Sequence, residues 1–105
     1  MNSADSAVVF AALGDRTRLA LLAHLGTRGP GSITELTDGM AMTRQAVTQH
    51  LQILLQAGLV RDRRKGRERI WEVEPDGLDI ARRYLESVSA QWDRRLGRLK
   101  RFVED

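Results

Sequence analysis

The sequence predicts a mostly helical protein with one small β-hairpin and a long helix at its C-terminal end. Apolar residues recur at helical spacing in several segments of the first 57 residues. Two strand-like segments flank a glycine within residues 59–74, and an apolar stripe runs through residues 78–103 at spacings of 3 and 4. The chain of 105 residues is expected to form one domain, spanning residues 1–105, with a modest core.

The composition excludes several classes of protein. Hydrophobic residues make up 42% of the chain and charged residues 30%, as in globular proteins. No apolar run reaches the roughly 18 residues of a membrane span, and the N-terminus lacks the basic start of a signal peptide, so no membrane partner is expected. The chain has no cysteine, which excludes disulfides and thiolate metal sites and favours a cytoplasmic protein.

Two helices are predicted before the first glycine-rich loop. The first is capped by Asp5 or Ser6 and ends at Gly14, and Asp15 then caps the second, over residues 16–25. A stretch with three glycines and a proline follows and breaks the helical pattern.

A helix-turn-helix is predicted over residues 32–57. Ser32 and Glu35 match a capping box and open a short helix, which Gly39 ends. Thr43 then caps a longer helix, and apolar residues at helical spacing form its buried face. These residues are Val47, Leu51, Leu54 and Leu55. In a DNA-binding helix-turn-helix the second helix lies in the major groove.

Glutamines line the outer face of the longer helix, where a solvated helix normally carries Glu and Lys. Gln45, Gln49, Gln52 and Gln56 fall within about 60° of arc. Glutamine presents a donor and an acceptor on one planar group, which matches the N6 and N7 atoms of adenine. A neutral solvated face is the alternative interpretation of this row.

The N-terminal half of this helix is the part that can enter a groove. Arg44 can reach guanine or a phosphate, Gln52 would be peripheral and Gln56 lies outside the contact. Residues 39–61 contain no Asp or Glu, as suits a surface that lies against phosphates. The residues expected to contact DNA from this helix are Thr43, Arg44, Gln45, Thr48, Gln49 and Gln52.

A basic hairpin is predicted over residues 59–74, with its tip at Lys65 and Gly66. The net charge of the chain is +3, and residues 61–69 alone hold six basic and two acidic residues. Long cationic side chains on a two-stranded ribbon suit phosphate contact or minor-groove insertion, although charge can also simply protect an edge strand. The expected DNA contacts are Arg63, Arg64, Lys65 and Arg67, whereas Asp62 and Glu68 are expected to pair with neighbouring arginines.

A long amphipathic helix is predicted over residues 78–103, after Pro-Asp-Gly ends the hairpin at residues 75–77. It would be roughly 39 Å long. The preceding body of about 75 residues would have a radius of gyration near 11 Å. Because such a body cannot cover the whole stripe, a second copy of the chain is expected to do so. The expected dimer interface comprises Leu85, Val88, Trp92, Leu96, Leu99 and Val103.

Nothing in the sequence indicates an enzyme or a cofactor. No glycine-rich phosphate loop and no cysteine nucleophile occur. His24 and His50 are expected to be packing or hydrogen-bonding residues, because they are far apart and no cysteine could complete a metal site. Trp71 and Trp92 lie at apolar positions and are expected in the core or an interface.

The sequence resembles the ArsR family of winged-helix bacterial repressors. The segments that carry this resemblance are ALGDRTRLALL, VTQHLQILLQAGLV, the basic RRKGRER and the long C-terminal helix. It implies a winged helix-turn-helix fold and a homodimer joined through the first and last helices. It also implies two recognition helices on a near-palindromic operator. Thr48 and Gln49 match positions that contact DNA in the family, whereas His50 and Leu51 match structural positions.

The chain departs from the metal-sensing members of this family. Those relatives bind metal through a cysteine-bearing motif in the first helix of the helix-turn-helix, or through His and acidic pairs in the last helix. Here residues 35–39 read ELTDG, without cysteine, and residues 78–105 contain no histidine. The C-terminal segment QWDRRLGRLKRFVED resembles a cysteine-free branch of the family that does not sense metals and whose inducers are mostly unknown.

These observations predict a homodimeric transcriptional repressor that binds double-stranded DNA in the bacterial nucleoid. Two other interpretations remain open from the sequence alone. One is a winged-helix module that docks an acidic protein surface and never binds DNA. The other is an architectural protein that binds DNA without sequence preference.

Overall fold

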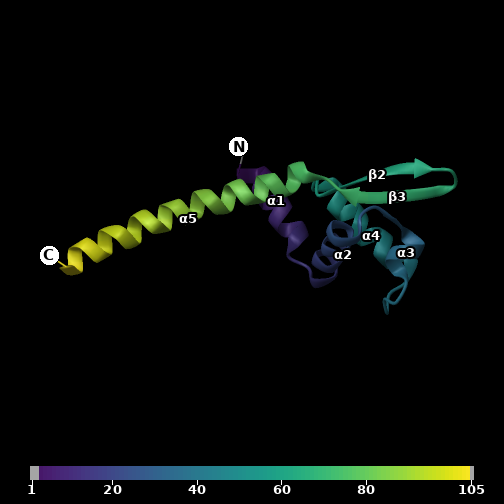
Figure 1. The fold of residues 1–105 in the computed structure, drawn as a ribbon, viewed down its shortest axis with the longest axis horizontal. Coiled ribbons are helices and arrows are strands. Elements are labelled where there is room, and N and C mark those ends of the chain that lie inside the picture. The colour runs from purple at the N-terminus through teal and green to yellow at the C-terminus, as the bar shows by residue number, and fades with distance from the viewer. Residues whose placement is uncertain (1–2, 105) are drawn as a thin grey trace.

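The computed structural model describes residues 3–104 and consists of five helices and three short strands over that range (Figure 1). Along the chain these are α1 (Ser3–Leu13), α2 (Arg16–Arg28), β1 (Gly31–Ser32), α3 (Ile33–Thr37), α4 (Arg44–Gln56), β2 (Val60–Lys65), β3 (Glu68–Val73) and α5 (Pro75–Glu104). Figure 1 shows α1 to α4 packed together, the hairpin β2–β3 extending from this body, and α5 leaving it on the other side. The predicted fold class, a winged helix-turn-helix with a long C-terminal helix, is confirmed.

Three helices begin at the caps that the sequence predicts. The side chains of Asp15, Ser32 and Thr43 each accept a hydrogen bond from the backbone N–H three residues further on, at 2.9, 3.3 and 3.0 Å. Ser32 Oγ also donates to Oε1 of Glu35 at 3.2 Å, so the predicted capping box closes through the two side chains. These caps satisfy backbone donors that have no partner within their own helices.

Two helix ends in the first half differ from the prediction. α1 begins at Ser3, so Asp5 and Ser6 lie inside the helix and neither is its cap; Asp5 instead places a negative charge in the first turn. α2 continues past residue 25 to Arg28, because one glycine is tolerated within a helix. Its end is set by Gly29, which has φ 86° and donates its N–H to the carbonyl oxygen of Leu25 at 2.9 Å.

The start of α5 also differs from the prediction. Pro-Asp-Gly does not end the hairpin as a turn but forms the first turn of α5, which begins at Pro75 rather than Leu78. Proline suits the first helical position because its missing N–H would have no partner there, and Asp76 adds a favourable charge. Gly77 is buried, and a Cβ atom at this position would lie 2.3 Å from the carbonyl oxygen of Gly58.

The hairpin belongs to a three-stranded antiparallel sheet with the order β1-β3-β2. The sequence does not predict β1, whose two residues pair with Ile70 and Trp71. The register of β2 against β3 runs from Val60 opposite Val73 to Lys65 opposite Glu68. Trp71 is fully buried in the core, while Ile70, which points to the other face, is only 7% exposed. Because both faces of β3 are covered here, its sequence lacks the alternation of a half-exposed strand.

The core holds the recognition helix, α4, in place. Val47, Leu51 and Leu54 have no exposed surface and pack with apolar residues of α1, α2, α3 and the sheet. Leu55, which the sequence places on the buried face, lies at its edge and is only half-buried. Burial of this face turns the glutamine face of α4 outward.

Most of α5 extends beyond the body of the molecule (Figure 1). The molecule measures 67 × 28 × 21 Å, and its radius of gyration is 18.2 Å. A compact chain of this length would have a radius of gyration of about 13 Å. No helix within residues 3–104 is both long enough and apolar enough to cross a membrane.

Candidate nucleic-acid interface

The first turns of α4 present side chains that the described part of the chain does not engage. Arg44, Gln45 and Gln49 are exposed, and none makes a side-chain hydrogen bond or ion pair with residues 3–104. Their hydrogen-bonding groups are therefore available to a ligand. The N-terminal end of a helix also favours anions, because its first N–H groups point outward and its dipole is positive there.

The threonines of this helix are already partly committed. Thr43 accepts the backbone hydrogen bond that caps α4. Thr48 is half-buried, and its hydroxyl donates to the carbonyl oxygen of Arg44 at 2.8 Å. The hydroxyl of Thr48 can thus still accept a hydrogen bond, and its methyl group can make an apolar contact. Gln52 is half-buried, whereas Gln56 is the last residue of α4 and is exposed.

The cations of the hairpin, which forms the wing of the fold, fall into two groups. Arg61 pairs with Glu72 and Glu74 at 3.1 and 3.0 Å, and the hydrogen bond to Glu72 is the largest cause of its raised pKa. Arg69 pairs with Asp62, as predicted for Asp62, and its guanidinium lies 4.3 Å from the centre of the Trp71 ring. The charges of these two arginines are therefore paired with nearby carboxylates rather than free.

The four wing cations predicted to contact DNA are less constrained. Arg63 lies 3.8 Å from Glu72, whereas Arg64, Lys65 and Arg67 make no ion pair with the described part of the chain. The tip itself is formed by Gly66, which has φ 64°, a conformation that favours glycine. Three exposed cations therefore cluster around a tight turn.

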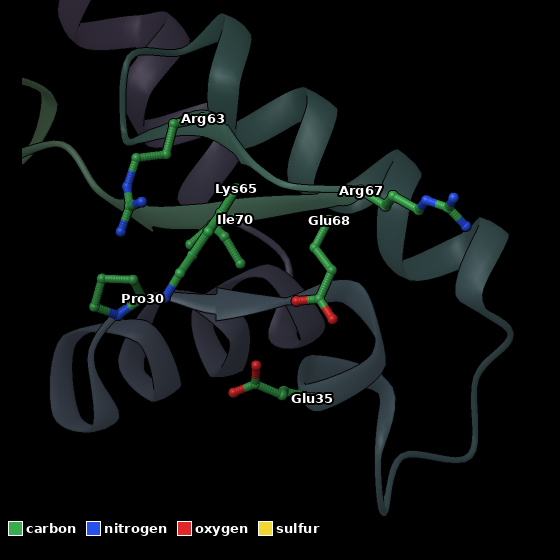
Figure 2. Close-up of a pocket in the computed structure, with 7 residues that line it drawn as sticks. All are labelled: Pro30, Glu35, Arg63, Lys65, Arg67, Glu68 and Ile70. Carbon is green, nitrogen blue, oxygen red and sulfur yellow. The ribbon is translucent and has the colours of Figure 1, made fainter.

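A hollow of about 610 Å³ lies under the wing (Figure 2). Its lining residues are Pro30, Glu35, Arg63, Lys65, Arg67, Glu68 and Ile70. Figure 2 shows Lys65 and Glu68 directed from the wing toward β1 and α3, while Arg67 points outward along the tip. Glu68 was expected to pair with a neighbouring arginine, but it makes no ion pair within residues 3–104; Figure 2 shows its side chain directed away from Arg63 and Arg67.

The apolar stripe of α5 is buried at Ala81 and largely uncovered from Leu85 onward, as the sequence predicts for the part beyond the body. Its exposed members range from 54% exposure at Leu85 to 80% at Val103, and Val88 is half-buried. The remaining members are Trp92, Leu96 and Leu99. Sequence reasoning missed Phe102, which is 83% exposed beside the stripe. It also missed Tyr84, whose ring packs edge-on against Phe10 of α1 at 5.5 Å between centroids.

The two histidines differ in their surroundings. His50 is half-buried on α4, and its Nδ1 atom lies 3.4 Å from a guanidinium nitrogen of Arg18 and 3.7 Å from Oδ2 of Asp15. The prediction of a hydrogen-bonding histidine is thus confirmed for His50. His24 is also half-buried but makes no side-chain hydrogen bond or ion pair with the described residues. Sequence reasoning did not identify Arg18, which lies 32 residues from its histidine partner.

The short α3, the longer α4 and the basic hairpin define a winged helix-turn-helix DNA-binding protein. Comparison with known proteins supports this class: residues 13–63 match a family described as "Helix-turn-helix domain". The HTH-type transcriptional regulator Rv2034 of Mycobacterium tuberculosis is 39% identical over 85 residues, which cover 81% of this chain and 76% of that protein. The chain belongs to the ArsR family of helix-turn-helix transcriptional regulators, which are not enzymes.

Solved structures agree with this assignment. An ArsR-like transcriptional regulator from Rhodococcus sp. RHA1 superposes with a TM-score of 0.83 at 39% identity, covering 95% of this chain and 93% of that one. The homodimeric winged helix-turn-helix DNA-binding domain of Mb0332 from Mycobacterium bovis superposes with a TM-score of 0.65 at 30% identity. That alignment covers 83% of this chain and 79% of the Mb0332 chain.

Proposed function

We propose that the protein is a homodimeric repressor that binds a near-palindromic operator in the bacterial nucleoid. One observation carries the proposal. An acid-free recognition helix lies in one fold with a basic wing, and neither Arg44, Gln45 and Gln49 on the helix nor the cations at the wing tip have side-chain partners among residues 3–104. Neutral planar amides suit base edges, and flexible cations suit phosphates.

The recognition helix supplies base contacts in this proposal. Gln45 and Gln49 lie one turn apart on the exposed face, so both amides can reach the floor of the major groove. Arg44 lies beside them in the first turn and can bind guanine or the nearest phosphate. Thr43 lies at the helix N-terminus, where backbone N–H groups favour a phosphate, and Thr48 and Gln52 lie at the margins of the contact.

The wing supplies contacts that do not depend on sequence. Arg64, Lys65 and Arg67 surround the Gly66 turn and have no ion-pair partner among residues 3–104, and Arg63 is held only loosely by Glu72. A two-subunit complex would make roughly 6–10 phosphate contacts, and its affinity would therefore fall steeply with salt concentration.

The dimer explains the shape of α5. Its stripe from Leu85 to Val103 is too exposed and too continuous for an isolated monomer, and a second copy of the same helix would cover it. The homologous domain Mb0332 is itself homodimeric, which supports the same assembly here. Two-fold symmetry would place the two recognition helices in successive major grooves, about 34–36 Å apart.

Selection of bound sequences from a random DNA pool tests this function. We expect a near-palindromic motif whose half-sites are separated by about one helical turn. Strong binding without an enriched motif would indicate an architectural protein instead. No binding even at low salt would overturn the DNA-binding proposal and favour docking to an acidic protein. Placing the selected motif over a promoter then tests repression, because activation of that promoter would contradict the repressor assignment.

A further inference from the structure

Arg18 lies where three helices meet. Although it belongs to the first turn of α2, its Nε donates to the carbonyl oxygen of Ala12 at 2.7 Å. A terminal nitrogen donates to the carbonyl oxygen of Ala11 at 3.3 Å, and the other terminal nitrogen faces Nδ1 of His50 on α4 at 3.4 Å. One guanidinium therefore joins the end of α1 to the middle of the recognition helix.

The contact with α1 supplies donors at the end of that helix. The carbonyls of Ala11 and Ala12 lie in its last turn, beyond which the helix has no further turn. The carbonyl oxygen of Ala11 also accepts the backbone N–H of Gly14 at 3.3 Å. The planar guanidinium carries five N–H donors in a fixed arrangement, so it can bind both carbonyls and still face a third acceptor. A positive charge at the C-terminal end of a helix is also favoured by the helix dipole.

The contact with α4 is directional. Arginine only donates, so Nδ1 of His50 is the acceptor of this contact in the tautomer that carries its proton on Nε2. The charged groups near this ring nitrogen within residues 3–104 are Arg18 and Asp15, both from the start of α2, whereas α1 contributes only carbonyls. Asp15 is held as the cap of α2 by the backbone N–H of Arg18.

We propose that Arg18 is a positioning residue that sets the orientation of the recognition helix against α1 and α5. α1 packs on α5, in part through Phe10 and Tyr84, so a link from α1 to His50 also fixes α4 relative to the helix that forms the proposed dimer. Buried side chains such as Val47 and Leu51 hold α4 in the core, and the contact between Arg18 and His50 adds a constraint that depends on direction. The effect on DNA recognition rests on the function proposed above.

The first test measures tolerance to operator geometry. Wild type should bind operators with one base pair added to or removed from the spacer about tenfold or more weakly than the selected operator. Arg18→Ala should bind the selected operator more weakly than wild type. It should also discriminate less between the selected spacer and spacers that are one base pair longer or shorter. Arg18→Lys keeps the charge and one donor, so it should recover part of the preference.

His50 provides a matched pair of variants. His50→Asn keeps an acceptor near the position of Nδ1 at similar helix propensity, whereas His50→Leu removes the acceptor. The asparagine variant should resemble wild type and the leucine variant should resemble Arg18→Ala. His24→Leu is the control, because His24 makes no side-chain hydrogen bond with the described residues. Equal spacing preference in wild type, Arg18→Ala and His50→Leu would overturn the proposal.

The second test needs no DNA. Because the chain has no cysteine, spin labels at Gln56→Cys and Ala90→Cys report only the distance between α4 and α5, and both sites are exposed. Doubly labelled chains diluted with unlabelled ones isolate the distance within one chain. We expect a narrow distance distribution that broadens or shifts in Arg18→Ala and in His50→Leu but not in His24→Leu.

The two tests separate the inference from the proposed function. If Arg18→Ala and His50→Leu have the same distance distribution as wild type, Arg18 has no positioning role, even if the protein binds its operator specifically. If the distribution broadens in these variants but the wild-type protein selects no DNA motif, the positioning role is supported and the proposed function is contradicted. If Arg18→Ala fails to fold, as judged by circular dichroism, His50→Leu and Arg18→Lys give the same comparison.

Discussion

Gly77 lies so close to Gly58 that no side chain fits between them. A Cβ atom at Gly77 would lie 2.3 Å from the carbonyl oxygen of Gly58 and 2.7 Å from its carbonyl carbon. The two glycines bring the first turn of α5 against the turn that follows the recognition helix. This contact is made by backbone atoms, which cannot move aside as a flexible side chain can.

We therefore expect Gly77→Ala to destabilise the fold. Forcing a methyl group against a backbone carbonyl should cost about 1–3 kcal/mol of unfolding free energy, measured by urea denaturation. Gly97 is a matched control on the same helix, because a Cβ atom there meets nothing within 4 Å. Gly97→Ala should stabilise by about 0.5–1 kcal/mol through helix propensity. Equal stability of the two variants would contradict the close approach.

Base contacts and phosphate contacts should separate by mutation. Arg44→Ala or Gln45→Ala should each cost about 1–3 kcal/mol of affinity for the selected operator and relax specificity at one position per half-site. Gln56→Ala, at the far end of the same face, should change neither. Fluorescence anisotropy with operator and scrambled DNA measures both quantities. If Arg44→Ala weakened the two DNAs equally, its role would be that of a phosphate contact.

Removing the free charge of the wing should act on every sequence alike. Arg64→Ala together with Arg67→Ala should weaken operator and random DNA by similar factors. The slope of log affinity against log salt should fall by about 0.9 for each phosphate that the protein no longer neutralises. Arg82→Ala together with Arg83→Ala removes the same charge from α5, where both arginines pair with Asp79. The α5 double variant should leave the slope nearly unchanged. A similar decrease in both double variants would show that the slope depends on net charge and not on the position of the charge in the wing.

The uncovered stripe of α5 should control assembly. Leu96→Glu or Leu99→Glu places a charge in the proposed interface, so we expect monomers and a large loss of operator affinity. Ala90→Glu, at an exposed position of the same helix outside the stripe, should leave the dimer intact. Sedimentation at micromolar concentration checks the assembly. A monomeric wild-type protein under these conditions would remove the dimer proposal.

Asp15 should make stability depend on pH. The backbone N–H of Arg18, with smaller contributions from the charges of Arg18 and His50, lowers the pKa of Asp15. A depressed carboxyl pKa contributes stability that is present above the pKa of the unfolded chain and is lost as the pH falls through the folded-state pKa. Wild type should therefore be more stable than Asp15→Asn at neutral pH, and thermal melts should converge in acid. A difference independent of pH would show that the charge of Asp15 is not involved.

Much of the local structure could be predicted because its causes lie within a few residues. Asp15, Ser32 and Thr43 cap helices by accepting an N–H three residues away. The spacing of Val47, Leu51 and Leu54 likewise fixes the buried face of α4, and with it the outward direction of the glutamines. The length of the α5 stripe was enough to predict that one subunit leaves it uncovered.

The tertiary structure decided what depends on distant parts of the chain. β1 is two residues long and exists as a strand only because β3 offers it hydrogen bonds from about 40 residues away. Nothing in the residues near Arg18 predicts its role, because its partner His50 lies 32 residues away in the sequence and comes beside it only in the fold. The strand register likewise decides which arginines of the wing are paired. It brings Arg61 and Arg69 beside carboxylates but gives Arg64 no such neighbour among the described residues. Helix caps and buried faces depend on residues that are close in sequence, whereas these contacts depend on how the packed elements are oriented in space.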